Sequence, residues 1–298
     1  MTATIIEVAV SGFGGKARNP RNPVSLPEIS ADLLTCIDAG AAVLHNHLDD
    51  FHLTGSAAAA RYGEAWKPVL TARPDAILYP TVTGDESSAL GKYDHCIACV
   101  TEHGGRMGVF DPGSVNFASG GADGTPGVDR QFIYINGYGL LDRVLSAYAE
   151  HAIAPSIAVF DPSFLRATIA YHRAGRLGRG ALVKLYFGGD HSALDGRPGL
   201  SFGLPPTLRA LDAYLEMLDG TGVIWAAALV GGDLLAHRDF AKAVLARGGH
   251  LRVGLEDYAG ERAPSNAELV AEAAALARDV GRPPATCAEA ARMLDLPR

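Results

Sequence analysis

Residues 27–47 read PEISADLLTCIDAGAAVLHNH, and they contain the unit from which the rest of the chain is built. Apolar residues recur at helical spacing as far as Ala39, and Gly40 then ends the predicted helix. A nearly continuous apolar run over residues 42–45 follows at once. Such runs are typical of strands that are buried on both faces, as in parallel sheets. The stretch therefore predicts a helix that leads directly into an inner strand.

The same alternation runs along the whole chain. Short apolar runs predict eight strands, at residues 5–10, 42–45, 77–80, 105–110, 156–160, 182–187, 223–229 and 251–255. Segments with helical spacing lie between them, at residues 27–39, 57–72, 89–103, 138–152, 163–174, 206–218, 233–247 and 265–280. Eight such units predict an α/β protein of the (β/α)8 TIM-barrel class, with one domain over residues 1–298. A doubly wound open sheet is the alternative, because the pattern alone does not show that the sheet closes.

Two long loops interrupt this rhythm. The first covers residues 111–137, after the fourth predicted strand, and is rich in Gly, Ser and Asp. The second covers residues 188–206, after the sixth strand. Loops that follow the strands of a TIM barrel lie on the face that carries the active site, and long ones are often lids or binding loops. We therefore expect both loops near a functional site.

The composition excludes several classes of function. The net charge of −7 and the pI near 5.8, without a long basic run, argue against a non-specific nucleic-acid-binding protein. No apolar run reaches the roughly 18 residues of a membrane-spanning helix, and no signal-peptide pattern opens the chain. Cys96 and Cys99 lack a second pair that could complete a structural zinc site, so we expect them to be buried helix residues. These features predict a soluble, cytoplasmic protein.

Polar residues follow the second predicted strand. His45 and His47 project to the same side of that strand because side chains alternate with period two, so both imidazoles could share one cation. The alternative is a pair of hydrogen-bonded histidines at the end of a strand. Asp49, Asp50 and His52 come next, either as partners that orient the imidazoles or as solvated loop residues.

The last strand carries charges where a barrel interior is expected. Alternation places Arg252, Gly254 and Glu256 on one face, with Asp257 just beyond. Closure of a barrel brings this strand near the second one. Glu256 could then complete a His₂Glu zinc site with an open coordination position. The alternative is a structural salt bridge between Arg252 and Glu256 or Asp257, but together with the two histidines the pattern favours the metal site.

At these residues the chain resembles the β-keto acid cleavage enzymes, the family typified by 3-keto-5-aminohexanoate cleavage enzyme. The resemblance runs over nearly the whole length, and its most specific stretch is residues 248–257, GGHLRVGLED. Further matches are SNAELV at residues 265–270, DAGA at residues 38–41 ahead of the two histidines, and GSVNF at residues 113–117. The resemblance implies a (β/α)8 barrel, in agreement with the strand count.

The resemblance also implies a site and a reaction. A zinc ion would be held by His45, His47 and Glu256. A β-keto acid and acetyl-CoA would exchange parts, giving acetoacetate and the CoA ester of the remaining acyl group. Asp257 would remove the α-proton as general base, and Arg252 would hold it in place and ionised.

The family pattern further indicates substrate contacts and assembly. Thr81 and Thr83, with Gly84, follow the third strand, and Ser114 and Asn116 lie in the GSVNF match. We expect these five residues to bind the substrate. The resemblance also implies a homo-oligomer, expected to be a tetramer.

Several positions depart from the family pattern. The acids usual before the fifth strand are absent, and Ser156 and Ala158 stand there instead. Asp111 precedes Pro112 where a threonine is usual, and Asp49 replaces an arginine. Asp49 leads to the hypothesis of a cationic or polar substituent on the substrate. Two rival functions stay open: a zinc-dependent aldolase or hydrolase that uses an aldehyde or water instead of acetyl-CoA, and a non-catalytic barrel that binds an acyl metabolite or a partner protein.

Overall fold

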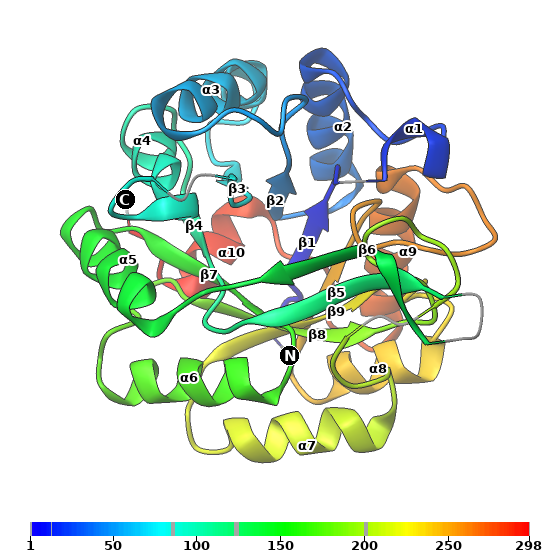
Figure 1. The fold of residues 1–298 in the computed structure, drawn as a ribbon. Coiled ribbons are helices and arrows are strands. Elements are labelled where there is room, and N and C mark those ends of the chain that lie inside the picture. The colour runs from blue at the N-terminus through cyan, green and yellow to red at the C-terminus, as the bar shows by residue number, and fades with distance from the viewer. Residues whose placement is uncertain (1, 13, 85–86, 122–124, 200–201, 298) are drawn as a thin grey trace.

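A computed structural model describes residues 2–12, 14–84, 87–121, 125–199 and 202–297 (Figure 1). In these residues, eight parallel strands form one sheet in the order β3-β2-β1-β10-β9-β8-β7-β4. The strands are β1 (Ile6–Ala9), β2 (Val43–Asn46), β3 (Ile77–Pro80), β4 (Met107–Phe110), β7 (Ala154–Val159), β8 (Leu182–Gly188), β9 (Ile224–Val230) and β10 (His250–Val253). The Arg106 N–H donates to the Leu78 carbonyl at 2.9 Å, which joins the two ends of this order. The sheet therefore closes almost completely into a barrel, which confirms the TIM-barrel class and excludes the open sheet.

Helices alternate with the strands and surround the barrel (Figure 1). They are α1 (Gly15–Arg18), α2 (Leu26–Ala39), α3 (Gly55–Ala72), α4 (His95–Thr101), α5 (Tyr138–Glu150), α6 (Pro162–Arg173), α7 (Leu208–Leu218), α8 (Arg238–Ala246), α9 (Asn266–Asp279) and α10 (Cys287–Leu294), with a 3₁₀ turn η1 (Gly91–Tyr93). None of the helices in the described residues combines the length and the apolar character that crossing a membrane requires.

The unit of α2 and β2 shows why the sequence alternates so sharply. α2 begins at a capping box, in which the Ser25 N–H donates to the Glu28 carboxylate at 3.0 Å. It ends at Gly40, which adopts a left-handed conformation with φ 118° and donates its N–H to the Cys36 carbonyl at 3.1 Å. The chain then turns directly into β2, where every residue is buried.

The core has an outer and an inner part. The outer part lies between the sheet and the helices, where Trp66 and Trp225 are buried as predicted, and so are Cys96 and Cys99 of α4. The inner part fills the amino-terminal end of the barrel with apolar side chains and is covered by α10. Its members include Ile5, Val43, Ile77, Met107, Leu182 and Leu294. The open, carboxyl-terminal end of the barrel is therefore the end available for a site.

The prediction of an irregular loop over residues 111–137 is wrong. It contains an antiparallel hairpin of β5 (Val115–Gly120) and β6 (Pro126–Tyr134), and residues 122–124 lie outside the described residues. Alternating aromatic and apolar residues pair across it, such as Phe117 with Phe132. The Gly-rich run near the turn hides this alternation in the sequence. The hairpin runs across the front of the barrel strands in Figure 1.

Two predicted helices are shorter than their patterns indicated. Residues 89–103 form η1 and then α4, and the helix expected over residues 233–247 begins only at Arg238. There the Asp233 carboxylate accepts the N–H groups of Leu235 and Ala236, at 3.0 and 3.2 Å, and so holds a turn in place of a first helical turn. The second long loop, after β8, stays largely irregular, with isolated bridges such as His191 to Pro198.

Candidate active site

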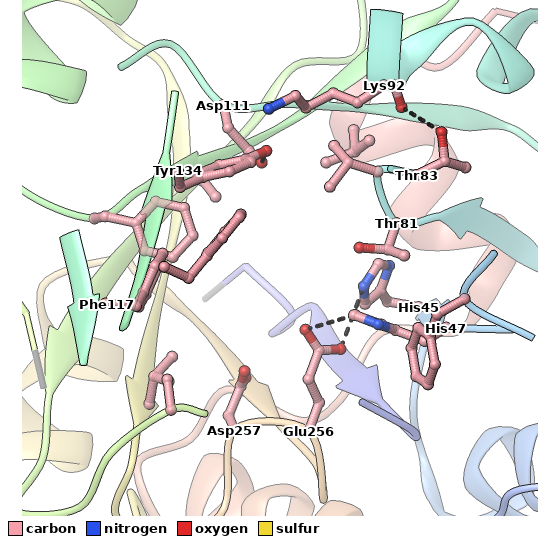
Figure 2. A pocket seen from close by; sticks show the side chains of 18 of the residues that line it. His45, His47, Thr81, Thr83, Lys92, Asp111, Phe117, Tyr134, Glu256 and Asp257 are labelled. Atoms are coloured by element: carbon pink, nitrogen blue, oxygen red, sulfur yellow. Dashed lines mark hydrogen bonds and ion pairs between the residues drawn. The ribbon is translucent and has the colours of Figure 1, made fainter. Parts of the chain in front are cut away.

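A cavity of about 410 Å³ lies at the carboxyl-terminal ends of the strands and beside the β5–β6 hairpin. Figure 2 shows His45 and His47 on one side of it and Phe117 on the other, with Glu256 and Asp257 between them at the bottom of the view. Its lining is largely apolar, with polar groups at the triad described next and at the opposite end. That combination is typical of a small-molecule site, and its place in the barrel is where TIM-barrel active sites occur.

His45, His47 and Glu256 form a compact triad at one side of the cavity. The two histidines come from the end of β2, and Glu256 follows β10, which flanks β1 on its other side. His45 Nε2 lies 3.2 Å from Glu256 Oε2, and His47 Nε2 lies 3.2 Å from Glu256 Oε1. The turn after β10 depends on Gly254, which has φ 138° and lies so close to β1 that a Cβ would come within 2.2 Å of the Ala9 carbonyl.

The surroundings of His45 favour a neutral imidazole whose Nε2 can act as a ligand. Its Nδ1 lies 3.3 Å from the Tyr79 carbonyl, and its ring stacks on the Tyr79 ring at 4.4 Å between centroids. Burial lowers the pKa of His45 to about 4. A hydrogen bond from Nδ1 to a carbonyl leaves the lone pair on Nε2, which faces the other two residues of the triad, as metal-binding histidines require.

The triad fits a divalent metal. One ligand atom from each of the three residues can be chosen so that all lie within 4.8 Å of one another. Two imidazole nitrogens and one carboxylate form the donor set of catalytic zinc sites, which keep a position for water or substrate. The residue types also suit cobalt, manganese or nickel. The structure therefore supports a metal site here, as the sequence predicted.

Arg252 fixes the carboxylate of Asp257 beside the triad. Its Nε and Nη2 donate to Asp257 Oδ2 and Oδ1 at 2.8 and 3.2 Å, and Nη2 lies 3.1 Å from Glu256 Oε1. Burial raises the pKa of Asp257, while the Arg252 charge opposes that shift. A buried carboxylate whose two oxygens are both held by one guanidinium has a fixed orientation and is suited to accept a proton from a bound molecule.

A buried charge network beneath the triad was not predicted from the sequence. Glu7 of β1 accepts from Arg252 Nη1 at 2.7 Å and lies 3.7 Å from Lys184 Nζ of β8. Lys184 also donates to Tyr79 Oη at 2.9 Å and to Ser156 Oγ at 2.6 Å, and the Tyr79 hydroxyl donates to Glu7. Burial alone would raise the pKa of Glu7, but the two cations beside it hold that pKa below its usual range.

The network includes Ser156 of β7, which stands where the family pattern has an acid. Its hydroxyl accepts a hydrogen bond from Lys184, whose charge lies beside Glu7 of β1. The signal that could have found it is one charged residue inside an apolar strand, as in IIEVAV at residues 5–10 and LVKLYF at residues 182–187. Such charges are costly to bury unless they are paired, so each predicts a partner inside the barrel.

Comparison with known proteins now identifies the family. The model of the family described as beta-keto acid cleavage enzyme matches residues 3–296. The chain belongs to this family. It is 30% identical to the 3-oxoadipate:acetyl-CoA acetyltransferase of Cupriavidus necator, over 98% of this chain and 95% of that protein. It is 28% identical to the 3-keto-5-aminohexanoate cleavage enzyme of Fusobacterium nucleatum, over 99% of each chain.

Solved structures agree with the fold. The apo structure of ObcA superposes with a TM-score of 0.69 at 18% identity, over 95% of this chain and 67% of that one. A Yersinia pestis dihydropteroate synthase superposes with a TM-score of 0.52 at 12% identity, over 94% and 92% of the two chains. At these identities the likeness extends to the barrel alone.

The structure brings three of the five predicted substrate-binding residues to the cavity of this family member. Thr81, Thr83 and Gly84 line it. Ser114 and Asn116 are exposed and lie outside the lining, and the Ser114 hydroxyl accepts the Asn136 N–H at 3.0 Å. The cause is the unpredicted hairpin: side chains alternate along β5, so Phe117 faces the cavity and Asn116 faces away.

Asp49 is not positioned to select a cationic substrate. It is exposed, lies outside the lining, and accepts from Arg61 Nε and Nη2 at 3.1 and 2.6 Å. The hypothesis built on this residue is therefore wrong. Its neighbour Asp50 lines the cavity instead.

The end of the cavity away from the triad carries Asp111, Tyr134 and Lys92 (Figure 2). The Tyr134 hydroxyl donates to Asp111 Oδ2 at 2.6 Å, and burial raises the pKa of Asp111. Lys92 Nζ donates to the Ile135 carbonyl at 2.9 Å and stands 4.6 Å from the centre of the Tyr134 ring. Position 111, which departs from the family pattern, thus lines the cavity.

Proposed function

We propose that this chain converts a β-keto acid and acetyl-CoA into acetoacetate and the CoA ester of the remaining acyl group. The observation that carries the proposal is the Asp257 carboxylate, fixed by Arg252 next to a His₂Glu triad, in a member of the β-keto acid cleavage enzyme family. The names of two relatives support acetyl-CoA as the second substrate, since one is a 3-oxoadipate:acetyl-CoA acetyltransferase and another a 3-dehydrocarnitine:acetyl-CoA trimethylamine transferase.

We assign the metal to zinc, held by His45, His47 and Glu256. When bound, the ion would act as a Lewis acid on the keto and carboxylate oxygens of the substrate. The neutral state that burial gives His45 favours this ligand set, because an imidazolium cannot coordinate a cation.

Asp257 is the proposed general base. Its carboxylate would accept a proton from the carbon between the keto and carboxylate groups of the β-keto acid. Arg252 would hold both oxygens and favour the ionised form before the transfer. The carbanion would form a bond to the thioester carbon of acetyl-CoA, and the CoA thiolate would leave that carbon and add to the original keto carbon. Cleavage of the bond between the original keto carbon and the α-carbon would then give the new acyl-CoA and the acetoacetate carbanion, which would take the proton back from Asp257.

Thr81, Thr83 and Gly84 are proposed to bind the substrate. All three line the cavity, and the Thr81 carbonyl is held by His95 Nε2 at 2.7 Å. The Thr83 N–H donates to the Lys92 carbonyl at 3.0 Å, so both hydroxyls stand on a fixed backbone. The homo-oligomeric state and the cytoplasmic location stay predictions.

Product analysis tests the proposal. The zinc-loaded enzyme is incubated with a panel of β-keto acids, with and without acetyl-CoA, and products are identified by mass spectrometry. We expect acetoacetate and a new acyl-CoA in equal amounts, and only with acetyl-CoA. Cleavage at the same rate without acetyl-CoA would instead support the aldolase or hydrolase function. Binding of a β-keto acid without turnover of any substrate would support the non-catalytic function.

A further inference from the structure

The side of the cavity across the barrel from the triad is built from aromatic rings. We call Phe117, Phe132, Tyr134, Phe160, Tyr186 and Phe202, all of which line the cavity, the aromatic wall. Tyr186 lies on β8, which is four places from β2 in the order of the eight strands and therefore opposite the histidines. Figure 2 shows Phe117 and Tyr134 on that opposite side.

The rings of the wall that surround Phe160 pack against it edge to face. The Phe160 ring centroid lies 5.5 Å from that of Phe117 and 5.0 Å from those of Tyr186 and Phe202, with interplanar angles between 77° and 87°. This is the arrangement that aromatic clusters prefer. The packing fixes the rings and leaves the wall as a rigid apolar surface, to which Ala158 and Val230 also contribute.

The charges around the wall disfavour a cationic ligand. Two ring faces are already taken by cations of the chain: Lys92 Nζ lies 4.6 Å from the Tyr134 centroid, and Arg252 Cζ lies 5.2 Å from the Tyr186 centroid. The carboxyl that contacts the wall is Asp111, whose Oδ2 accepts from the Tyr134 hydroxyl at 2.6 Å, and burial raises its pKa. At these two ring faces, a further ammonium group would meet like charges.

An anionic group gains little at the same place. A carboxylate would exchange its hydration for the aromatic wall, and burying an unpaired charge is strongly unfavourable. At the end of the wall, Lys92 Nζ donates to the Ile135 carbonyl at 2.9 Å and faces the Tyr134 ring. An uncharged apolar group, in contrast, gains from every ring that it covers.

We propose that the β-keto acid cleaved here carries a neutral, apolar substituent of about the size of a phenyl ring, and that this substituent packs on the aromatic wall. The proposal rests on the proposed function, which places the keto and carboxylate groups of the substrate at the triad. From there, the substituent extends across the cavity to the wall. The acyl-CoA product is therefore a neutral arylalkanoyl or medium-chain acyl thioester.

A comparison of three substrates tests the predicted preference for a neutral, apolar substituent. The value of kcat/KM is measured with saturating acetyl-CoA for 3-oxo-5-phenylpentanoate, for 3-oxoadipate and for 5-amino-3-oxohexanoate. We expect the phenyl compound to be preferred by roughly tenfold or more over both charged ones, since a pocket contact of a few carbon atoms gives this much discrimination. Equal or faster turnover of either charged substrate overturns the proposal but leaves the proposed function standing.

Binding measurements without acetyl-CoA distinguish a failure of the proposed function from a failure of the proposed substrate preference. If none of the three substrates is turned over, the proposed function fails. Calorimetric titration of the zinc-loaded enzyme with the same compounds then decides the inference by itself. Tighter binding of 3-oxo-5-phenylpentanoate supports it, whereas tighter binding of 3-oxoadipate or 5-amino-3-oxohexanoate overturns it.

Substitution of one ring tests whether the aromatic wall causes the preference for the phenyl compound. Phe117→Ala on the hairpin should reduce the preference for the phenyl compound about fivefold or more, mainly through KM. Val128→Ala is the matched control, because Val128 lies on the same hairpin and is 77% exposed. If Phe117→Ala does not fold, Phe202→Leu serves the same purpose. Unchanged selectivity in a folded wall variant overturns the proposal.

Discussion

The two sides of one cavity are built on opposite principles. The side formed by β1, β2 and β10 carries Glu7, His45, Arg252, Glu256 and Asp257, and the charges on it are buried beside opposite charges. The other side, formed by β7, β8 and the hairpin, is a set of packed rings. The difference separates two tasks: the charged side can perform the chemistry, and the aromatic side can choose the substrate. Changes on one side should therefore alter rate, and changes on the other should alter selectivity.

Among changes on the charged side, Asp257→Asn should reduce catalysis most. The amide keeps the shape but is a far weaker base, so kcat should fall by about a thousandfold or more, at the upper part of the range for general-base residues. Zinc content and KM should change little. Asp49→Asn is the control, because Asp49 pairs with Arg61 outside the cavity. Steady-state kinetics check the prediction, and activity within tenfold of wild type would contradict it.

Glu7 and Lys184 should be coupled energetically. Each alone balances buried charge, so Glu7→Gln or Lys184→Met should lower the free energy of unfolding by about 3 kcal/mol. Removing both leaves fewer unpaired charges, and the double variant should cost at least about 1 kcal/mol less than the sum of the single variants. Urea unfolding measures all three. Strict additivity would show that the pair does not stabilise the charged side.

Glu7→Gln should also affect the reaction through Arg252. The loss of one carboxylate partner frees Arg252 to reorient, so we expect kcat to fall about tenfold while KM stays similar. A matched comparison is Asp257→Asn, which removes the base itself and should cost far more. An unchanged kcat in folded Glu7→Gln would show that Glu7 is structural and does not position Arg252.

The two sides also differ in how far the sequence predicts them. The sequence predicts much of the charged side, because His45 and His47 stand two residues apart and Glu256 follows a strand with an arginine. Such patterns are local. The aromatic wall brings together rings from the β5–β6 hairpin and from three other stretches, and the sequence pattern predicts a loop where the hairpin lies. The network of Glu7 and Lys184 is not predictable from local sequence, because the partners of each residue lie on distant strands. Only closure of the barrel shows why each charge is tolerated.

The smallest expected effect concerns the stability contributed by Asp32, a carboxyl without a cationic partner among the ion pairs of the described residues. This partly buried carboxyl accepts from Asn266 Nδ2 at 2.5 Å, and burial raises its pKa from 3.8 to about 6, unlike the paired Glu7. Because the folded-state pKa is the higher one, its stabilising contribution is present below pH 4 and is lost as the pH rises through 6. Relative to Asp32→Asn, the wild type should lose on the order of 1 kcal/mol of stability between pH 5 and pH 8. A difference that does not vary with pH in urea unfolding would contradict this.

The most direct test of the account is the zinc content of the purified chain after incubation with zinc and removal of the excess. The wild type should hold about one zinc ion per chain, and His47→Ala should hold essentially none, since two remaining ligands bind zinc poorly. His52→Ala, which changes an exposed histidine five residues away, should keep the wild-type content. A wild type that takes up no zinc, or a His47→Ala variant that keeps a full equivalent, would contradict the assignment of His45, His47 and Glu256 as the metal site.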